Sequence, residues 1–236
     1  NKLYGGTINL MGKSFSKFGW NAVFVDNDNP EAFRAAVTEK TRAIFVESLA
    51  NPGGVIVDLE AIAKIAQEAE VPLIVDNTMA TPWLCRPFEW GADLVVHSTT
   101  KFLSGQGNAM GGIVIDSGRF PWFGNAKYPS LSEPSPDYNG LTFAETFGDL
   151  AFTLYSHAVS LRDLGCSQSP MNAWITLNGV ETLPLRMERH VVNAEKVAGF
   201  LQQHPSVEWV SYAGLSSSPY YKLAQKYLQG KAGSVF

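Results

Sequence analysis

Two hydroxyl side chains and a lysine come directly after an apolar run, and this combination could bind a phosphorylated aldehyde and react with it. The apolar residues 92–96 lead into His-Ser-Thr-Thr-Lys at 97–101, and the Gly-rich segment 104–107 follows. Ligands bind at strand ends in α/β sheets because the turn there exposes side chains and backbone N–H groups. Desolvation can lower the pKa of a lysine and make its amine a nucleophile toward a carbonyl. Ser98 and Thr100 would point the same way along an extended backbone, which suits pyridoxal phosphate (PLP); a surface lysine after two turn-forming hydroxyls is the alternative.

Three more residues could complete such a site. Asp76 ends the apolar run 73–75, and its carboxylate could keep a pyridine nitrogen protonated so that the ring accepts electrons; a turn cap is the alternative. Asn51 follows another expected strand and could hydrogen-bond a ring oxygen, or it could simply shape a turn. Tyr4 could stack on a planar cofactor, or it could be a buried aromatic before a flexible turn. Because the strand-end residues have complementary roles, together they favour a cofactor site.

Apolar runs alternate with helical periodicity along the chain, and this predicts the elements that position these residues. Asp58 is expected to cap a helix whose apolar residues recur with the 3.6-residue period. Residues 118–140 are rich in Pro, Gly, Ser and aromatic residues, which predicts a long loop. The expected strands are 20–26, 43–47, 72–76, 94–97, 112–115 and 207–210, and the expected helices include 30–40, 181–203 and 220–229.

Continuous apolar strands between helices are typical of an α/β fold, in which helices cover both faces of a mainly parallel sheet. The rhythm of the sequence changes near Gly179. This change predicts a large domain over 1–178 and the beginning of a smaller domain over 179–236. The start at Asn1, which is not a methionine, and the strand-like residues 233–236 predict a piece of a longer polypeptide.

Composition narrows the class of protein. The 236 residues carry a formal net charge of −4 at pH 7, which recommends neither nucleic acid nor an anionic membrane as a partner. No apolar run approaches the roughly 20 residues of a membrane span. Cys85 and Cys166 stand far apart, and the four histidines show no metal-ligand spacing. Because such thiols fit a reducing compartment, we expect a cytoplasmic protein without a metal site.

Four segments occur in the order and spacing of one enzyme family. They read LYGGT at 3–7, ES with NP at 47–52, VDNT at 75–78 and HSTTKF at 97–102. In these motifs the sequence resembles the Cys/Met-metabolism PLP-dependent enzymes, and the resemblance covers essentially the whole chain. It implies the PLP-dependent transferase-like fold (aminotransferase fold type I), with a PLP-binding large domain and a smaller α+β C-terminal domain. It also implies a homotetramer whose active sites are shared between subunits.

The same resemblance implies a role for each residue of the expected site. Lys101 would form a Schiff base with PLP and then shuttle protons between substrate carbons. Asp76 would pair with the pyridine nitrogen, and Ser98 and Thr100 would hold the phosphate. The carried-over positions therefore coincide with those that the residue types suggest on their own.

The two remaining site residues and the substrate also follow from the resemblance. Asn51 would contact the phenolic oxygen of the ring, and Tyr4 would stack on the ring and assist proton transfer near the leaving group. Segments 169–174 and 181–190 look most like the O-acetylhomoserine sulfhydrylase branch of the family. That branch implies γ-replacement in methionine biosynthesis, in which O-acetylhomoserine and sulfide give homocysteine and acetate. The alternatives are methionine γ-lyase or cystathionine synthase or lyase activity, or a non-catalytic binding module.

The sequence departs from the family pattern at one motif and lacks other family elements. The usual Ser-Pro after the glutamate is Ser48-Leu49 here, which affects the rigidity of that turn. The family's Gly-rich phosphate turn, the tyrosine and arginine that reach a neighbouring subunit's phosphate, and the arginine for the substrate carboxylate fall outside these residues. We therefore expect weak or no turnover from this segment alone.

Overall fold

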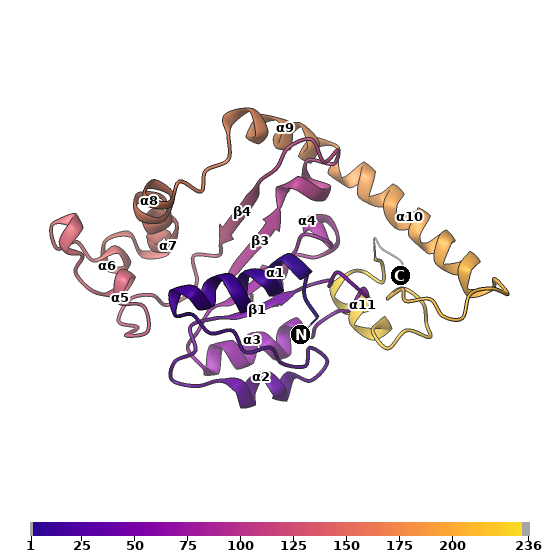
Figure 1. The fold of residues 1–236 in the computed structure, drawn as a ribbon, viewed down its shortest axis with the longest axis horizontal. Helices are drawn as coiled ribbons and strands as arrows, with labels where there is room; N and C mark the ends of the chain where they lie inside the picture. Colours follow the sequence, from indigo (N-terminus) through magenta and orange to yellow (C-terminus); the bar gives the residue numbers. More distant parts are fainter. Residues whose placement is uncertain (1, 233–236) are drawn as a thin grey trace.

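A four-stranded sheet lies at the centre of the chain, in a computed structural model that describes residues 2–232 (Figure 1). The strands follow chain order; β1, β2 and β3 run parallel, and β4 is antiparallel to β3. Their bounds are Ile44–Glu47 for β1, Leu73–Asp76 for β2, Leu94–Ser98 for β3 and Gly112–Asp116 for β4. The expected mainly parallel α/β sheet is confirmed, with one antiparallel strand at its edge.

Helices connect the strands and make up most of the second half of the chain. In Figure 1, α2 and α3 lie below the sheet, α9 and α10 form a long arm across the top, and α5 to α8 group at one end. The bounds are Gly5–Asn9 (α1), Pro30–Ala36 (α2), Leu59–Glu68 (α3), Thr81–Leu84 (α4), Pro129–Ser132 (α5), Phe143–Phe147 (α6), Ala151–Tyr155 (α7), Arg162–Leu164 (α8), Pro170–Glu181 (α9), Leu183–Gln202 (α10) and Tyr221–Tyr227 (α11).

The main hydrophobic core joins the sheet to α3 and to the C-terminal helices. Val46 and Val75 from the strands, Ile62 from α3, Met187 from α10 and Leu228 after α11 are all fully buried in one cluster. Each such side chain contributes roughly 1.5–3 kcal/mol by leaving water. In this core, elements distant in the sequence pack against β1 and β2. The strands are therefore held rigidly, and so are the side chains at their ends.

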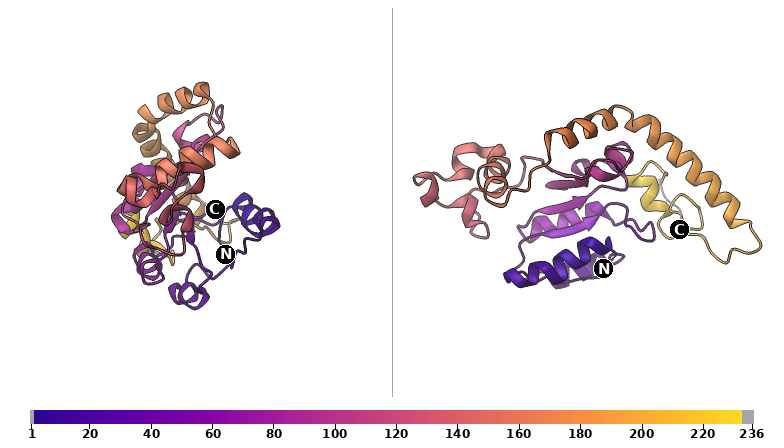
Figure 2. Two further views of the ribbon diagram at one scale, coloured as in Figure 1. Left: turned by 90° about the vertical axis from the view of Figure 1, so that its left-hand side faces the viewer. Right: turned by 45° about the horizontal axis from the view of Figure 1, so that its top comes forward.

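A smaller aromatic cluster lies apart from the main core, at the α5–α8 end of the molecule (Figure 2). Trp122 stacks on Phe152 with ring centroids 5.4 Å apart, and Phe120 lies 4.4 Å from Trp122. Phe143, at the start of α6, is 2% exposed in the same cluster. The expected loop at 118–140 therefore contains the short helix α5, and its aromatic residues pack against those of α6 and α7.

Helix starts follow the expected capping chemistry. Asp58 precedes α3, and its Oδ1 accepts a hydrogen bond from the Ala61 backbone N–H at 3.2 Å, as predicted. The expected helix at 30–40 begins at Pro30 but ends at Ala36. The long C-terminal helix is also confirmed, as α10, and the division of the chain at residue 179 stays a prediction.

Two expected strands are wrong. Residues 20–26 form irregular chain in which Trp20 is 64% and Val23 72% exposed, and residues 207–210 are also irregular. A β-rich run becomes a strand only where a neighbouring strand supplies hydrogen bonds, and neither run pairs with the sheet. The strand expected from residues 233–236 lies outside the described residues.

Candidate active site

The carboxyl ends of three parallel strands meet at one edge of the sheet and carry the expected site residues. Glu47 on β1 is in register with Asp76 on β2, and Asp76 is in register with Val96 on β3. The Ser48 N–H donates to the Asp76 carbonyl at 3.0 Å, and the Asn77 N–H donates to the Val96 carbonyl at 2.9 Å. The ladder thus continues past the strand ends, which fixes the spacing of the residues that follow each strand.

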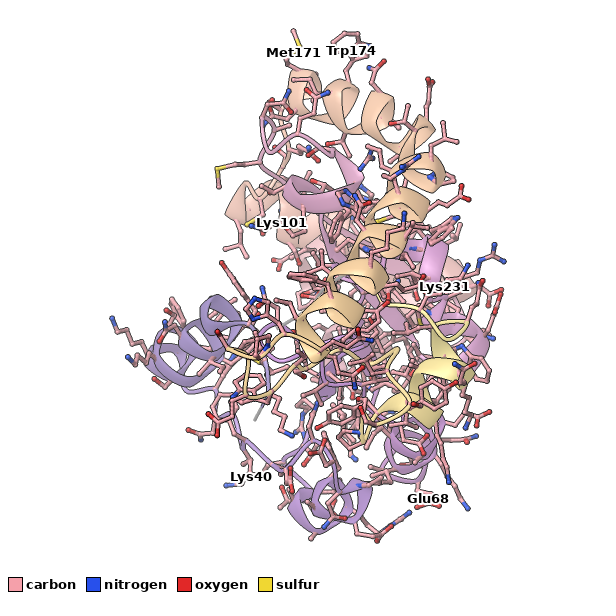
Figure 3. The ribbon with its side chains drawn as sticks, turned by 90° about the vertical axis from the view of Figure 1, so that its right-hand side faces the viewer. Lys40, Glu68, Lys101, Met171, Trp174 and Lys231 are labelled. Atoms are coloured by element: carbon pink, nitrogen blue, oxygen red, sulfur yellow. The ribbon has the colours of Figure 1, made fainter. Side chains whose placement is uncertain are left out.

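Lys101 lies just beyond β3, in the helical turn Thr99–Leu103 (η4). Its φ of −91° and ψ of −121° break the helical path, so its side chain leaves the turn in a direction a regular helix would not allow. The side chain is exposed, and no hydrogen bond or ion pair within residues 2–232 engages its Nζ. Figure 3 shows Lys101 below α9, at the other end of the molecule from Lys40 and Glu68. This chain therefore presents a free amine at the strand edge.

Thr78 links the Asp76 carboxylate to the end of β3. Its hydroxyl donates to Asp76 Oδ1 at 2.5 Å and accepts a hydrogen bond from the Ser98 backbone N–H at 2.8 Å. The Thr78 backbone N–H also donates to Asp76 Oδ1, at 2.9 Å. The carboxylate is thus oriented before any ligand binds. Thr78 belongs to the VDNT motif, but no role for it was predicted from the sequence. Its position two residues after the acid was the available signal, because Asx turns use that spacing.

The two expected phosphate-binding hydroxyls differ in their contacts. No hydrogen bond among the described residues involves the side-chain oxygen of Ser98, which is half-buried. The Thr100 hydroxyl accepts from the Gly111 N–H at 3.1 Å and donates to the Gly111 carbonyl at 3.3 Å. Thr99 between them is 3% exposed, and its Oγ1 has no hydrogen-bond partner within residues 2–232. Ser98 is therefore directly available to a ligand, whereas Thr100 is tied to the start of β4.

Glu47 brings Tyr4 and Asn51 to the same edge. Its Oε1 accepts a hydrogen bond from the Tyr4 backbone N–H at 2.6 Å, and its Oε2 accepts one from the Asn51 backbone N–H at 3.1 Å. Glu47 is only 4% exposed, whereas the Tyr4 side chain is 49% exposed. No role for Glu47 was predicted from the sequence. The available signal was a single charge at the end of the apolar run 43–47, since buried carboxylates need partners.

Burial dominates the electrostatics behind the strand ends. It raises the pKa of Glu47, and the two N–H donors partly oppose this rise. Burial lowers the pKa of His97, which is 4% exposed, although the nearby Asp76 charge acts in the opposite direction. Burial also raises the pKa of the Cys85 thiol to about 12. The side chains of Glu47, His97 and Cys85 are therefore shielded from water, whereas the side chain of Lys101 is exposed.

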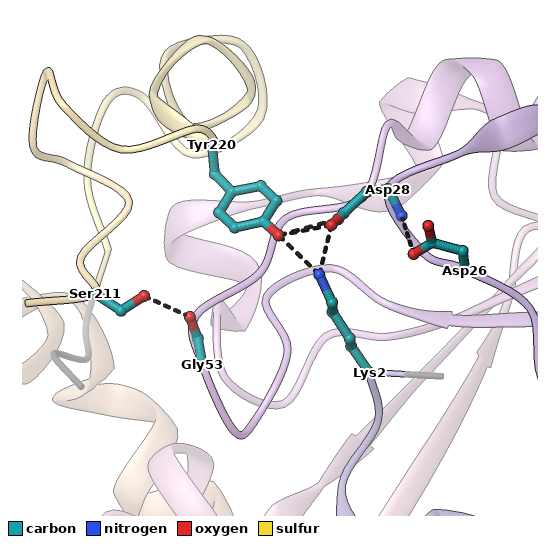
Figure 4. A network of polar contacts seen from close by, with 6 residues as sticks. All are labelled: Lys2, Asp26, Asp28, Gly53, Ser211 and Tyr220. Carbon is teal, nitrogen blue, oxygen red and sulfur yellow. Dashed lines mark hydrogen bonds and ion pairs between the residues drawn. The ribbon is translucent and has the colours of Figure 1, made fainter.

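Two residues of the C-terminal segment 211–220 contact the chain close to Tyr4 and to Asn51, the two hydrogen-bond partners of Glu47 (Figure 4). Lys2 Nζ contacts Asp28 Oδ2 at 2.5 Å and donates to the Tyr220 hydroxyl oxygen at 3.0 Å. The Ser211 hydroxyl donates to the Gly53 carbonyl at 2.9 Å. Lys2 lies two residues before Tyr4, and Gly53 lies two residues after the Asn51 position. The C-terminal segment thus holds the chain next to Tyr4 and the chain next to Asn51.

The described residues contain no group of three or more His, Cys, Asp and Glu side chains arranged to hold a metal ion. Within the same residues, every helix is too short or too polar to cross a bilayer. The groups available for chemistry at the strand edge are therefore an amine, a carboxylate, hydroxyls, a carboxamide and a phenol.

Comparison with known proteins matches the entire chain to one family. The family model described as "Cys/Met metabolism PLP-dependent enzyme" matches residues 1–236. An O-acetyl-L-homoserine sulfhydrylase of Leptospira meyeri is 52% identical over 96% of this chain and 53% of its own length. A homocysteine synthase of Schizosaccharomyces pombe is 46% identical over 99% of this chain and 55% of its own length. The chain thus spans about half the length of these curated relatives.

Solved structures agree with these matches. A Campylobacter jejuni protein described as an O-acetylhomoserine (thiol)-lyase superposes with a TM-score of 0.95 at 41% identity, covering 99% of this chain and 58% of that one. Its crystal structure contains a lysine that carries a pyridoxyl-5'-monophosphate group. The O-acetylhomoserine sulfhydrylase of Wolinella succinogenes superposes with a TM-score of 0.86 at 34% identity, covering 99% of this chain and 63% of that one. The expected fold is confirmed by both.

Proposed function

Because the chain belongs to the Cys/Met metabolism family of PLP-dependent enzymes, we propose that the intact protein is an O-acetylhomoserine sulfhydrylase. It would replace the acetate of O-acetylhomoserine by sulfide and release homocysteine and acetate. One observation carries the proposal. An amine, a carboxylate and hydroxyl groups suited to PLP lie at one edge of the sheet, in a chain whose relatives are named sulfhydrylases and homocysteine synthases.

The donor set at this edge fits PLP. The Lys101 amine is exposed and free for the aldehyde carbon, and the Asp76 carboxylate is already oriented by Thr78 toward one position. The Ser98 hydroxyl has an unused hydrogen-bonding capacity that a phosphate oxygen could satisfy. The aldehyde, the pyridine nitrogen and the phosphate would therefore each meet a matching group within a few residues of a strand end.

When bound, PLP supplies an electron sink for negative charge that develops on the substrate carbon. Asp76 would keep the proton on the pyridine nitrogen, because a fixed carboxylate stabilises a cationic ring. Ser98 would donate a hydrogen bond to the phosphate, and Thr100 would do so by turning its hydroxyl proton away from the Gly111 carbonyl. Lys101 Nζ would take and return protons at the substrate carbons, a task for which an amine on a flexible stem is suited.

Asn51 and Tyr4 would hold the remaining sides of the ring. The Asn51 carboxamide would donate to the phenolic oxygen, and the Tyr4 ring would stack on the cofactor and limit access of water to the reacting face. The Tyr4 hydroxyl would serve as a proton donor near the leaving acetate. Tyr4 suits this position because half of its side chain is accessible while its backbone is anchored to Glu47.

We further propose that the intact protein is a cytoplasmic homotetramer with shared active sites, and that its large domain ends at residue 178. The two free cysteines support a reducing compartment. Large exposed apolar side chains on α9, among them Met171 and Trp174 in Figure 3, support contact with further protein surface.

Substrate selectivity tests the proposal. The intact, PLP-loaded protein should form homocysteine from O-acetylhomoserine and sulfide much faster than it releases an oxoacid from methionine or cystathionine. Lys101→Ala should lose about 10³-fold or more of this rate, whereas Lys40→Ala, which changes an exposed lysine far from the site, should not.

The other outcomes are informative. Preferential release of an oxoacid and ammonia would indicate a lyase of the same family. A well-folded protein that neither takes up PLP nor turns over any of these amino acids would indicate a non-catalytic binding module.

A further inference from the structure

Glu47 is a buried carboxylate that opens the motif at 47–52 but has no task in the chemistry proposed above. It ends β1, is 4% exposed and belongs to no ion pair among residues 2–232. A carboxylate in such a place is costly unless hydrogen bonds replace its water. Its hydrogen bonds come from two backbone N–H groups, those of Tyr4 at 2.6 Å and Asn51 at 3.1 Å.

These two donors belong to the two residues proposed to stack on the cofactor ring and to contact its oxygen. One carboxylate therefore joins segments that lie 43 and 4 residues from it along the chain. Each oxygen takes one donor, so the two amides are held at the width of a single carboxyl group. No other described contact joins the backbones of Tyr4 and Asn51 through one group.

The segment that carries Tyr4 has few other attachments. Helix α1 follows Tyr4 directly and contains no buried residue. Leu3, just before it, is 6% exposed and supplies the local apolar anchor, and Lys2 before that contacts Asp28 and Tyr220. The remaining backbone hydrogen bond of Tyr4 is within α1, from the Ile8 N–H to the Tyr4 carbonyl. Among the described residues, Glu47 is therefore the hydrogen-bond partner that ties the Tyr4 backbone directly to the sheet.

We infer that Glu47 is a positioning residue that sets the distance between Tyr4 and Asn51 and so preforms the slot for the cofactor ring. This inference rests on the proposed function, because it presumes that a planar ring binds between the two residues. Glu47 acts through their backbones and contacts neither cofactor nor substrate.

Conservative variants of the intact protein separate this role from a contribution of charge or of folding. Glu47→Gln keeps the shape but replaces one oxygen by an NH₂ group, which then faces an N–H donor. Glu47→Asp keeps the charge but shortens the side chain by one methylene, so one carboxyl group cannot reach both amides. Glu39→Gln is the matched control, because Glu39 is exposed and belongs to no ion pair among the described residues.

Two readouts test the inference. Hydrogen–deuterium exchange of the PLP-free intact protein should become at least about 10-fold faster in peptides covering 2–8 and 49–54 in both Glu47 variants, because hydrogen bonds to a charged acceptor are lost. PLP titration should show binding at least about 10-fold weaker, with a smaller induced circular-dichroism band from the less constrained ring. Glu39→Gln should match the wild type in both.

Several results would overturn the inference. Folded Glu47 variants with unchanged exchange in both peptides would show that Glu47 does not hold these amides. Wild-type PLP affinity and circular dichroism in Glu47→Asp would show that only its charge matters. Failure of both variants to fold would assign Glu47 to the fold alone. Exchange does not depend on the cofactor, so a protein that binds no PLP would contradict the proposed function and the slot, while exchange would still decide whether Glu47 anchors the two segments.

Discussion

The two sides of the strand edge differ in how completely their polar groups are paired. On the β1–β2 side, the side chains of Glu47, Asp76 and Thr78 form hydrogen bonds with neighbouring backbone or side-chain groups. On the β3 side, the Lys101 amine and the Ser98 hydroxyl have no partner among the described residues. The difference separates groups that hold a shape from groups left available for a ligand. Such division is expected of a preorganised site, where fixed groups orient the ligand and free groups react with it.

The largest contrast expected between paired and free groups is in thiol reactivity. Cys85 backs the paired side, since its carbonyl accepts from Asn77 Nδ2 at 2.9 Å, and it is 1% exposed, whereas Cys166 is exposed. With a pKa of about 12, Cys85 has about 10⁻⁴ of its thiol ionised at pH 8, so its alkylation should be at least about 10³-fold slower than that of Cys166. Peptide mapping after timed alkylation measures both rates.

The same raised pKa predicts how stability depends on pH. The folded chain holds the Cys85 proton more tightly than the unfolded chain, so this group lowers the free energy of unfolding as pH rises above about 9. Cys85→Ala should lessen that decline. Rapid labelling of Cys85 in the native protein at pH 8 would show that the β1–β2 side opens readily, and it would contradict the slow alkylation expected of this thiol.

Removing the central carboxylate should have the next largest effect. Asp76→Ala in the intact protein should weaken PLP binding by about 10²-fold, because truncating one partner of a buried charge pair costs several kcal/mol. Asp137→Ala is the control, since Asp137 is exposed and lies in the turn Pro136–Tyr138, beside the other hydrophobic cluster. Absorbance titration with PLP gives both affinities, and equal values would remove Asp76 from the site.

Breaking the link between the two sides should have a moderate effect. Thr78→Val keeps the shape but removes the hydroxyl that joins Asp76 to the Ser98 N–H. We expect about 10-fold weaker PLP binding, because the Ser98 donor loses its acceptor. Thr78→Ser should restore most of the affinity. If Val and Ser behave alike, the hydroxyl does not orient Asp76.

The smallest effect is expected at the contact of Tyr220 with Lys2 and Asp28. Tyr220→Phe removes the hydroxyl that contacts Lys2 and Asp28 at 3.0 Å (Figure 4). The free energy of unfolding in urea should fall by at most about 1 kcal/mol, and by less at high salt, because the ion pair is partly exposed. A loss several times larger would mean that the C-terminal segment, rather than Glu47, holds the Tyr4 segment in place.

Sequence patterns predicted the sheet and its strand-end residues better than the polar contacts among them. The runs at 43–47, 72–76 and 94–97 were long, apolar and followed by polar residues, so both the strands and the positions of Asp76 and Lys101 could be foreseen. The run at 20–26 has similar composition but no strand to pair with, and pairing is a property of the folded chain. Glu47 and Thr78 stand in motifs visible in the sequence, but their roles could not be assigned, because these roles depend on which backbone groups the fold brings to them.

Locating the cofactor on the chain tests the central claim most directly. The intact protein would be reduced with borohydride, digested and examined by mass spectrometry, with Lys101→Ala alongside. We expect a pyridoxyl group on the peptide that contains Lys101 and none fixed at that peptide in the variant. A pyridoxyl group on a different lysine, or a folded protein that retains no cofactor after PLP is added, would contradict it.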